Sequence, residues 1–542
     1  MKEIQFAAAL LAAIFISPIF VSAGAEAAPQ SFAIPVTLDP SIEGVRSGRI
    51  IVFAEKVEPG ADAADKVDFS IFAPERVSVA AREVEALAPG AAALVGTGVD
   101  AFPQSFADLA PGEYRFQAVL DRNHNYNYAG RSGGDIVSGV VAATLPGGVP
   151  ALTLKDIVPG HTMETVLASM PEERAAVLEQ NLENVRPIDF VSPALSKFWG
   201  RPIHIKGFAA LPPNYKKDDA RYPAVYATRG FGALSIAVQK GAATIAGLMA
   251  SGEAPPMIWF YLDQSIATGA HEFTDSVNNG PWGEALTEEL IPYLQKEFAA
   301  DPRAGSRFLT GHSSGGWTSL WLQVRYPALF GGAWPTSPDP ADFHAFTNID
   351  LYAPNANAYR DEKGEPRPLV RDKGKVYVTI EQYVKLEEVL GPYGGQFASF
   401  DWVFSPKADD GRPQKAIDRV SGAVDADVAA YWREHYDIAH IVKRDWPKLK
   451  KNLDGKIHLY VGTADTFYLD EPSRLLKGVF DELGAHQDFT FVPDRTHFDL
   501  YNEGDDKNAL LKSIAWQMYA KARPKACRAA GEICTGAAAA AN

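Results

Sequence analysis

A serine at a sharp turn is the chain's clearest candidate for covalent chemistry. Residues 311–315 read Gly-His-Ser-Ser-Gly; the apolar pair Phe308 and Leu309 precedes them, and a helix-like segment, Trp317–Tyr326, follows. This order predicts a strand, a tight turn and a helix, with Ser313 at the turn of a G-x-S-x-G pattern. Glycines on both sides let strand and helix approach where a Cβ would clash. Ser313 is therefore the candidate nucleophile, although Gly/Ser-rich turns without chemistry can match the same pattern.

A nucleophilic serine needs a base and an acid that orients the base. With this type of turn, the acid and then the histidine follow the serine along the chain. Asp465 comes just after the strand-like run 457–461, and His497 comes after the strand-like run 489–492. We therefore expect Asp465 to be the acid and His497 the base. Asp470 remains an alternative acid, because loops after such a strand vary in length.

Backbone N–H groups next to the nucleophile are expected to stabilise the oxyanion. The two candidates belong to Ser314, which follows the nucleophile, and to Phe231, in the loop after the strand-like run 224–228. The polar and aromatic loop 271–282 follows another strand and fits either a substrate contact or a turn before a helix at Gly283. The candidate substrate-binding residues are Arg229, Asn279, Trp282 and His312.

Alternating strands and helices from about residue 200 predict the scaffold that positions these residues. The expected strands are 203–210, 224–228, 257–262, 307–310, 333–336, 457–461 and 489–492; the expected helices include 283–298, 317–326 and 473–483. This alternation indicates a mostly parallel sheet with helices on both faces. Between residues 338 and 453 the alternation stops, which predicts an insertion that caps the edge of the sheet.

The N-terminal part has a different pattern. Short strand-like runs separated by Pro/Gly turns over residues 29–150 predict an all-β sandwich of immunoglobulin-like type. Residues 151–199 are expected to form a helical connector, with a helix over 163–185. The Asx-rich run 121–127 fits a hydrogen-bonded turn better than a calcium loop, because the glycine and terminal glutamate of such a loop are missing.

Composition limits the partners and the compartment. The 542 residues carry a formal net charge of -15, which argues against nucleic acid or an anionic lipid surface as the main partner. Residues 1–27 resemble a cleaved export signal with an apolar run over 6–21, and an N-terminal membrane anchor is the alternative. Cys527 and Cys534, the two cysteines of the chain, are expected to close a local disulfide in the 521–542 tail. No metal site is expected, since His435 and His440 match no ligand motif.

The part from residue 200 to about 520 resembles the esterase D-type family of α/β-hydrolases, which includes enterochelin, feruloyl and acetylxylan esterases. Four stretches carry this resemblance, over roughly residues 200–340 and 455–520: Tyr222-Pro223 to Gly230, Glu284 to Tyr293, Gly311 to Gly316, and Asp465 with His497. The resemblance implies an α/β-hydrolase fold and hydrolysis of carboxylic esters through an acyl-enzyme. Two features depart from the family pattern: Arg229-Gly230 stands where His-Gly is usual, and the 338–453 insertion is longer than in compact members.

The sequence thus predicts an exported serine esterase, periplasmic or extracellular, that needs no cofactor. Its expected substrate is a small-molecule, glycan-linked or lipid-linked ester, and neither nucleic acid binding nor stable membrane insertion is expected. Acyl transfer by the same three residues, peptide hydrolysis, and a non-catalytic binding protein on a hydrolase scaffold are the alternatives. The acyl and alcohol groups, the role of the N-terminal β domain and the oligomeric state are left open.

Overall fold

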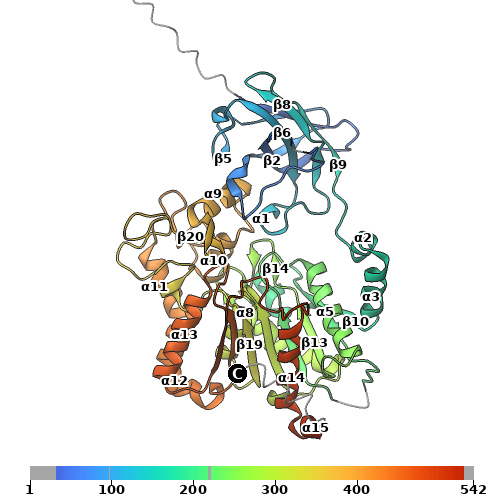
Figure 1. Ribbon diagram of the computed structural model, residues 1–542, viewed down its shortest axis with the longest axis vertical. Coiled ribbons are helices and arrows are strands. Elements are labelled where there is room, and N and C mark those ends of the chain that lie inside the picture. The colour runs from blue at the N-terminus through green and yellow to red at the C-terminus, as the bar shows by residue number, and fades with distance from the viewer. Residues whose placement is uncertain (1–31, 61, 97, 218–220, 530–542) are drawn as a thin grey trace, which may run out of the picture.

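The computed structural model describes residues 32–60, 62–96, 98–217 and 221–529 (Figure 1). The predicted export signal, residues 1–27, and Cys534 lie outside these residues. Within them, no helix is both long enough and apolar enough to cross a membrane.

Nine N-terminal strands form one hydrogen-bonded sheet in the order β4-β1-β9-β7-β6-β2-β3-β5, with β8 also paired to β6. All pairs are antiparallel except β1 with β9. The all-β prediction is therefore confirmed, whereas one continuous sheet does not establish the immunoglobulin-like arrangement. The strands are β1 Ile34–Leu38, β2 Arg46–Lys56, β3 Val77–Leu87, β4 Ala92–Val95, β5 Asp100–Phe102, β6 Gly112–Asp121, β7 Ile136–Ser138, β8 Val141–Leu145 and β9 Leu152–Ile157.

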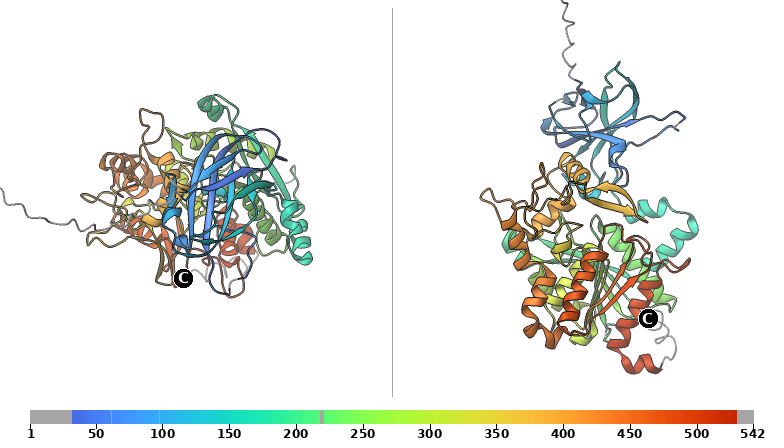
Figure 2. Two further views of the ribbon diagram at one scale, coloured as in Figure 1. Left: turned by 90° about the horizontal axis from the view of Figure 1, so that it is seen from above. Right: turned by 60° about the vertical axis from the view of Figure 1, so that its left-hand side comes forward.

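This N-terminal sheet has an apolar core on each face. One core joins inward side chains of β1, β2, β6 and β9, because alternate residues of these strands point to the same side. The second core joins the opposite face of β2 and β3 to Leu386, Val389 and Leu390 of helix α9 (Ile380–Leu390). The N-terminal domain is thus packed on α9, and both views in Figure 2 place it over that end of the molecule.

The larger sheet has eight strands in the order β10-β11-β13-β12-β18-β19-β22-β23. The strands β10, β11 and β13 pair antiparallel, and all the other pairs are parallel. Every residue of β12, β13, β19 and β22 is buried, as expected where helices cover both faces of a parallel sheet. The strands are β10 Val185–Val191, β11 His204–Ala210, β12 Ala224–Thr228, β13 Ile258–Leu262, β18 Arg307–His312, β19 Gly332–Thr336, β22 His458–Gly462 and β23 Asp488–Val492.

Helices cover both faces of this sheet, as the sequence predicts. One face packs against α3 Glu172–Leu182, α5 Ser235–Ala250 and α14 Ala509–Ala522. The other face packs against α4 Pro193–Trp199, α6 Trp282–Glu284, η3 Ala285–Leu290, α7 Ile291–Glu297, α8 Ser314–Arg325, α12 Ile438–Leu453 and α13 Asp470–Glu482. Small elements outside the layers are η1 Pro74–Arg76, η2 Phe106–Asp108, η4 Ala304–Ser306, α1 Tyr126–Ala129, α2 Met163–Ala168, α15 Pro524–Ala529 and the short pairs β14 Ser265–Ile266 with β15 Gly269–Ala270 and β16 Asp275–Ser276 with β17 Gly280–Pro281.

Between β19 and α12 the chain leaves the sheet and forms the insertion, residues 337–437. It contains η5 Phe343–Ala345, the hairpin β20 Pro368–Asp372 with β21 Lys375–Thr379, and the helices α9, α10 Gln396–Phe404 and α11 Ala426–His435. Its apolar side chains belong to the same core as one face of the large sheet. Because α12 packs on α8 and α13 as a sheet-covering helix, the insertion ends before residue 453, the end that the sequence predicts.

Residues 151–199 differ from the predicted helical connector. The expected helix over 163–185 is two helices, α2 and α3, and the segment also holds β9 and the edge strand β10. Pro187 within β10 argues against a strand at the level of sequence, because proline lacks the backbone N–H that pairs with a neighbouring strand. It is tolerated here because β10 is an edge strand of the sheet. The larger sheet therefore begins at residue 185 rather than at 200.

Candidate active site

Ser313 lies at a strained turn between β18 and α8. Its φ of 59° is positive, a conformation that costs energy for a residue with a side chain and that marks sharp strand-to-helix turns. The neighbouring glycines make this turn possible: a Cβ on Gly311 would lie 2.1 Å from the carbonyl oxygen of Gly315, and one on Gly315 would lie 2.4 Å from that of Thr228. The two glycines therefore allow a tight turn between β18 and α8, with Ser313 at its tip.

His497 and Asp465 meet beside this turn. The Nδ1 atom of His497 lies 3.0 Å from Oδ2 of Asp465, and both side chains are buried. Burial alone would raise the pKa of Asp465, but the charge of His497, its hydrogen bond and the N–H of Phe467 outweigh burial and lower this pKa. The carboxylate thus stays ionised and holds the ring so that the other nitrogen, Nε2, is free for proton transfer.

A second buried carboxylate, Asp339, contacts the serine pair. Ser313 donates from Oγ to Oδ1 of Asp339 at 3.3 Å, and Ser314 donates from Oγ to Oδ2 at 2.6 Å. Burial raises the pKa of Asp339 to about 6 despite these hydrogen bonds. No sequence pattern points to Asp339, because it follows β19, a strand that supplies neither acid nor base in the expected order.

His312 lies against the ring of His497, the candidate base. Its ring centroid is 4.4 Å from that of His497, and its Nδ1 lies 3.1 Å from Oγ1 of Thr336. Burial, followed by the charge of His497, lowers the pKa of His312 to about 3. His312 is therefore neutral at physiological pH and adds no charge beside His497.

The loop after β12 approaches the serine closely enough to serve as an oxyanion loop. A Cβ on Gly230 would lie 3.0 Å from the Cβ of Ser313, so only glycine fits there without displacement. The carbonyl of Arg229 accepts a hydrogen bond from Nε2 of Gln264 at 2.8 Å, which fixes the start of the loop. The backbone N–H groups of Phe231 and Ser314 have no hydrogen-bond partner among the described residues, so both can donate to a ligand.

A cavity of about 340 Å³ opens in front of Ser313 and His497. This volume lies at the lower end of the range for small-molecule sites. Its walls are mostly apolar and come from four separate parts of the chain: Ile71, Asn127 and Tyr128 of the N-terminal domain; Gly230, Phe231, His312 and Ser313 of the large sheet; Asp339, Pro340, Thr347, Leu369, Tyr383, Gln396, Phe397 and Phe400 of the insertion; and Phe467, Leu469, His497 and Phe498 of the last two loops.

The N-terminal domain reaches this cavity through the predicted Asx-rich turn. The carboxylate of Asp121 accepts hydrogen bonds from the N–H groups of Asn123, Asn125 and Tyr126, as expected for such a turn. The turn starts the short helix α1, which carries the cavity-lining residues Asn127 and Tyr128. The Asx-rich turn, for which the sequence predicts only a structural role, therefore places the side chains of Asn127 and Tyr128 at the cavity.

Two contacts fix α1 against its surroundings. Asn127 donates from Nδ2 to the carbonyls of Glu387 and Gly391, both at 2.9 Å. The Tyr128 ring meets the Phe231 ring edge-on, with the centroids 4.8 Å apart. The N-terminal domain thus supports the loop after β12 directly.

Arg371 of the insertion braces the loop that carries Asp465. It donates from Nε to the carbonyl of Asp465 at 2.8 Å and pairs with the Asp470 carboxylate at 2.9 Å. Asp470, the alternative acid, is thus engaged by arginine, whereas Asp465 is the carboxylate that contacts His497. The long sequence separation of about a hundred residues is why the sequence gives no signal for Arg371.

The predicted substrate-binding residues are divided between different places. His312 lines the cavity, while Arg229 lines an adjacent cavity of about 560 Å³ behind His312 and His497. Asn279 is fully buried and lines neither, and Trp282 lines a separate cleft. Asn279 and Trp282 therefore do not line the Ser313 cavity; the carbonyl of Asn279 accepts the indole N–H groups of Trp199 and Trp282 instead. Cys527 is disulfide-bonded, and its predicted partner Cys534 lies outside the described residues.

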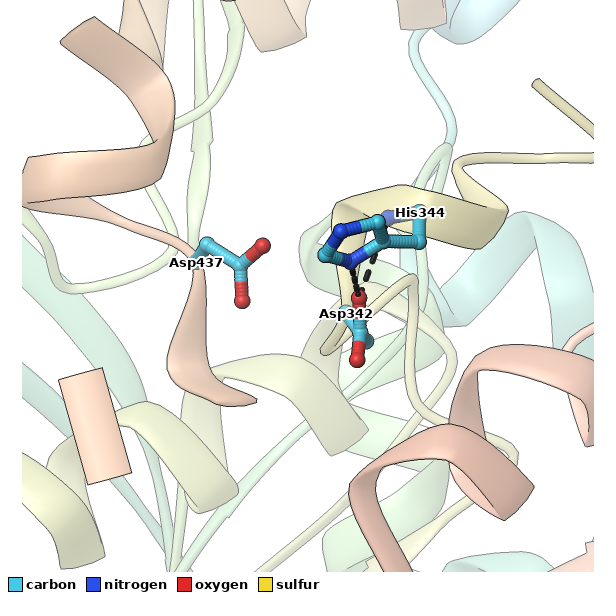
Figure 3. Close-up of side chains that lie close together, drawn as sticks. All are labelled: Asp342, His344 and Asp437. Carbon is cyan, nitrogen blue, oxygen red and sulfur yellow. Dashed lines mark hydrogen bonds and ion pairs between the residues drawn. The ribbon is translucent and has the colours of Figure 1, made fainter. Parts of the chain in front are cut away.

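Asp342, His344 and Asp437 form a group whose ligand atoms lie within 4.8 Å of one another, a spacing that could hold a metal ion (Figure 3). Their hydrogen bonds also have a structural explanation. Asp342 accepts from the N–H and ring of His344 at the start of η5, and Asp437 accepts from the N–H of His440 at the start of α12. These carboxylates cap two helix starts, and His435 and His440, where the sequence predicts no metal site, are not part of the group.

A comparison with protein families decides the assignment. Residues 199–479, just over half of the chain, match the family model Esterase, described as "Putative esterase". The chain belongs to the Esterase family. This esterase is a carboxylic ester hydrolase, and the matched residues contain Ser313 and Asp465. No match was found among curated proteins.

Solved structures similar to this esterase have low sequence identity. A ferulic acid esterase is 13% identical, with a TM-score of 0.38, over 62% of this chain and 97% of that one. An S-formylglutathione hydrolase from Agrobacterium tumefaciens is 16% identical, with a TM-score of 0.35, over 62% of this chain and 95% of that one. The fluorophosphonate-binding serine hydrolase FphF from Staphylococcus aureus is 10% identical, with a TM-score of 0.37, over 62% of this chain and 97% of that one.

Proposed function

We propose that this esterase hydrolyses its ester through an acyl-enzyme, with Ser313 as nucleophile, His497 as general base and Asp465 as the orienting acid. The observation that carries the proposal is the meeting of these three residues at one cavity: Ser313 and His497 line it, and Asp465 holds the imidazole from behind. They come from three separate loops, so their convergence is a property of the fold.

In the proposed reaction, the Ser313 hydroxyl turns from Asp339 toward His497. Oγ attacks the ester carbonyl carbon while Nε2 of His497 accepts the hydroxyl proton. The carbonyl oxygen becomes an oxyanion that the N–H groups of Ser314 and Phe231 stabilise. His497 then returns the proton to the alcohol oxygen as the carbon–oxygen bond breaks, and water repeats the sequence to release the acid.

The cavity favours an apolar acyl or alcohol group of moderate size. Phe231, Phe397, Phe400 and Phe467 contribute aromatic walls, and the volume of about 340 Å³ admits a ring-containing group but not a long lipid chain. Because Tyr128 and Asn127 complete the wall, we propose that the N-terminal domain takes part in substrate choice together with the insertion.

We also propose that the protein is exported to the periplasm or outside the cell. The apolar run 6–21 with small residues after it supports this, as does the disulfide at Cys527, since disulfides persist in oxidising compartments. Amino-terminal sequencing of protein recovered from the cell envelope and medium tests the proposal. A protein that retains Met1 and stays with the cytosolic fraction would contradict it.

Ester hydrolysis of a short-chain p-nitrophenyl ester tests the mechanism. Ser313→Ala should lower kcat/KM by at least about a thousandfold, because it removes the attacking oxygen. Ser314→Ala is the matched control: it deletes the neighbouring hydroxyl but keeps the backbone N–H, so activity should stay within about tenfold of wild type. Equal losses in both variants, or none in Ser313→Ala, would exclude Ser313 as the nucleophile.

A further inference from the structure

A large cleft lies apart from the Ser313 cavity, between the N-terminal domain and the large sheet. Its volume is about 1260 Å³, above the range of drug-sized sites, so a matching ligand would be a short oligomer rather than a single small molecule. Lining residues come from β2 and β3, from residues 199–206, from the β14 turn and from the insertion. Tyr393 lines this cleft, and its carbonyl accepts a hydrogen bond at 3.4 Å from Nδ2 of Asn127, which lines the Ser313 cavity. The cleft and the Ser313 cavity are therefore separated by a single layer of residues.

Aromatic rings form part of the cleft wall. Trp199, Trp282, Tyr393 and Trp402 line it, and Trp199 is 38% exposed. The indole N–H groups of Trp199 and Trp282 both donate to the carbonyl of Asn279, at 3.1 and 2.9 Å. These bonds fix the polar edges of the two rings. The Trp282 ring is stacked on His271, with the centroids 3.5 Å apart, so the partly exposed Trp199 ring is the one that offers a rigid apolar surface, at little entropic cost on binding. Loop 271–282, singled out in the sequence, thus serves as the support of this wall.

Cations and hydroxyl groups share the same walls. Arg201 and Lys206 are exposed to the cleft, and neither forms an ion pair among the described residues. The remaining basic groups are engaged: Arg49 pairs with Asp100, His124 with Glu83, and His204 with Asp189. Ser265 and Thr268 add hydroxyl oxygens that donate to Asp263 and Asn279 and can still accept from a ligand. A protein with a net charge of -15 therefore presents two exposed cations at this cleft: Arg201, and Lys206, whose charge also acts on the cleft-lining Asp263 carboxylate.

We infer that the cleft binds an acidic oligosaccharide, a short chain of sugar rings that bear carboxylates. Flat aromatic faces suit the apolar faces of sugar rings, and hydroxyl-bearing walls suit the rims of these rings. The guanidinium of Arg201 can hold a carboxylate with two parallel hydrogen bonds, which a neutral sugar cannot accept as well. The inference does not depend on the Ser313 chemistry, because no residue of the cleft belongs to the Ser313 cavity.

Titration calorimetry with the full-length protein tests the inference. The probes are trigalacturonate and α-1,4-linked galactotriose, which share ring and linkage and differ in their carboxylates. We expect trigalacturonate to bind at least about tenfold more tightly than galactotriose, and its affinity to fall as salt is raised. Binding should persist in Ser313→Ala, which separates this outcome from the fate of the proposed mechanism.

Two variants and their matched controls locate the binding site. Arg201→Gln should weaken trigalacturonate about tenfold and leave galactotriose unchanged, and Trp199→Ala should weaken both. The control for Arg201 is Lys450→Gln, which removes an exposed cation on α12. The control for Trp199 is Trp516→Ala on α14, whose indole N–H also donates to a backbone carbonyl, that of Glu253.

Neither control should change binding, and hydrolysis of a small ester should stay the same in all four variants. Circular dichroism melting curves establish that each variant is folded. Equal affinity for the two trisaccharides, no binding of trigalacturonate at millimolar concentration, or unchanged binding in folded Arg201→Gln would overturn the inference.

Discussion

Replacing Asp339 by asparagine should move the acid limb of the pH–rate profile to lower pH. The charges of ionised Asp339 and of an imidazolium at His497 attract each other, and hydrolysis needs an uncharged imidazole to accept the serine proton. Asparagine keeps the shape and a hydrogen-bonding oxygen but removes the charge.

The size of the effect follows from the site geometry. Ser313 Oγ lies 3.3 Å from Asp339, and proton transfer to His497 needs a distance of about 3 Å, so the two charges come within about 6 Å. At an effective dielectric constant of about 20 their attraction is roughly 3 kcal/mol, or about two pH units. Screening by solvent weakens this attraction, so we expect the acid limb to shift by about one pH unit. The plateau kcat should be about tenfold lower, because the imidazolium that forms during the reaction loses a stabilising anion.

Stability gives a second readout with a defined sign. The folded-state pKa of Asp339 is raised from 3.8 to about 6, so the folded protein binds this proton more tightly than the unfolded chain. The ionised carboxylate therefore costs stability above pH 6, by up to about 3 kcal/mol, and this cost disappears as the pH falls from 6 toward 3.8. Asp339→Asn should melt at a higher temperature than wild type at pH 8, and this difference in melting temperature should disappear near pH 4.

Asp470→Asn is the matched control for these measurements. Asp470 is also a buried carboxylate near the site, but it pairs with Arg371 and makes no contact with Ser313. The acid limb of kcat/KM should therefore not move in this variant. An unmoved limb in Asp339→Asn, a shift toward higher pH, or an equal shift in both variants would refute the reasoning.

Three further predictions concern the supports of the site. Gly311→Ala should abolish activity and cooperative thermal melting, because its Cβ would meet the Gly315 carbonyl at 2.1 Å, whereas Gly478→Ala in open space on α13 should raise stability by about 0.5–1 kcal/mol. Tyr128→Ala should lower kcat/KM for a p-nitrophenyl ester about three- to tenfold by loosening Phe231, and Tyr128→Phe should not, since the hydroxyl has no partner among the described residues. Arg371→Ala should lower kcat more than it changes KM, because the Asp465 loop loses its brace; a pure KM effect would contradict this.

Local patterns in the sequence predict the large sheet and the positions of the three candidate catalytic residues. The expected strands 224–228, 307–310 and 457–461 all coincide with observed strands to within two residues at either end. The reason is that buried parallel strands are short continuous apolar runs, and all their carboxyl ends lie at one edge. Residues that directly follow such strands therefore lie close to one another. The positions of Ser313, Asp465 and His497 could for this reason be predicted from the strands alone. Their catalytic roles remain predictions.

The supports of the site depend on contacts between distant segments, for which local periodicity has no signal. Asp339, Arg371 and Tyr128 lie in loops or short elements whose sequences would fit an ordinary surface turn. Only the packing of the N-terminal sheet on α9, and of the insertion on the large sheet, brings them to the cavity.

The same distinction explains the errors. Trp282 and Asn279 follow a strand of the large sheet, as active-site residues should, but Trp282 lines another cleft and the buried Asn279 holds its indole N–H. The sequence by itself determined which layer the chain forms and which edge carries the chemistry, because strand formation and burial are decided within a few residues. Tertiary structure alone decided which loops meet there, because that depends on packing free energies shared among segments hundreds of residues apart.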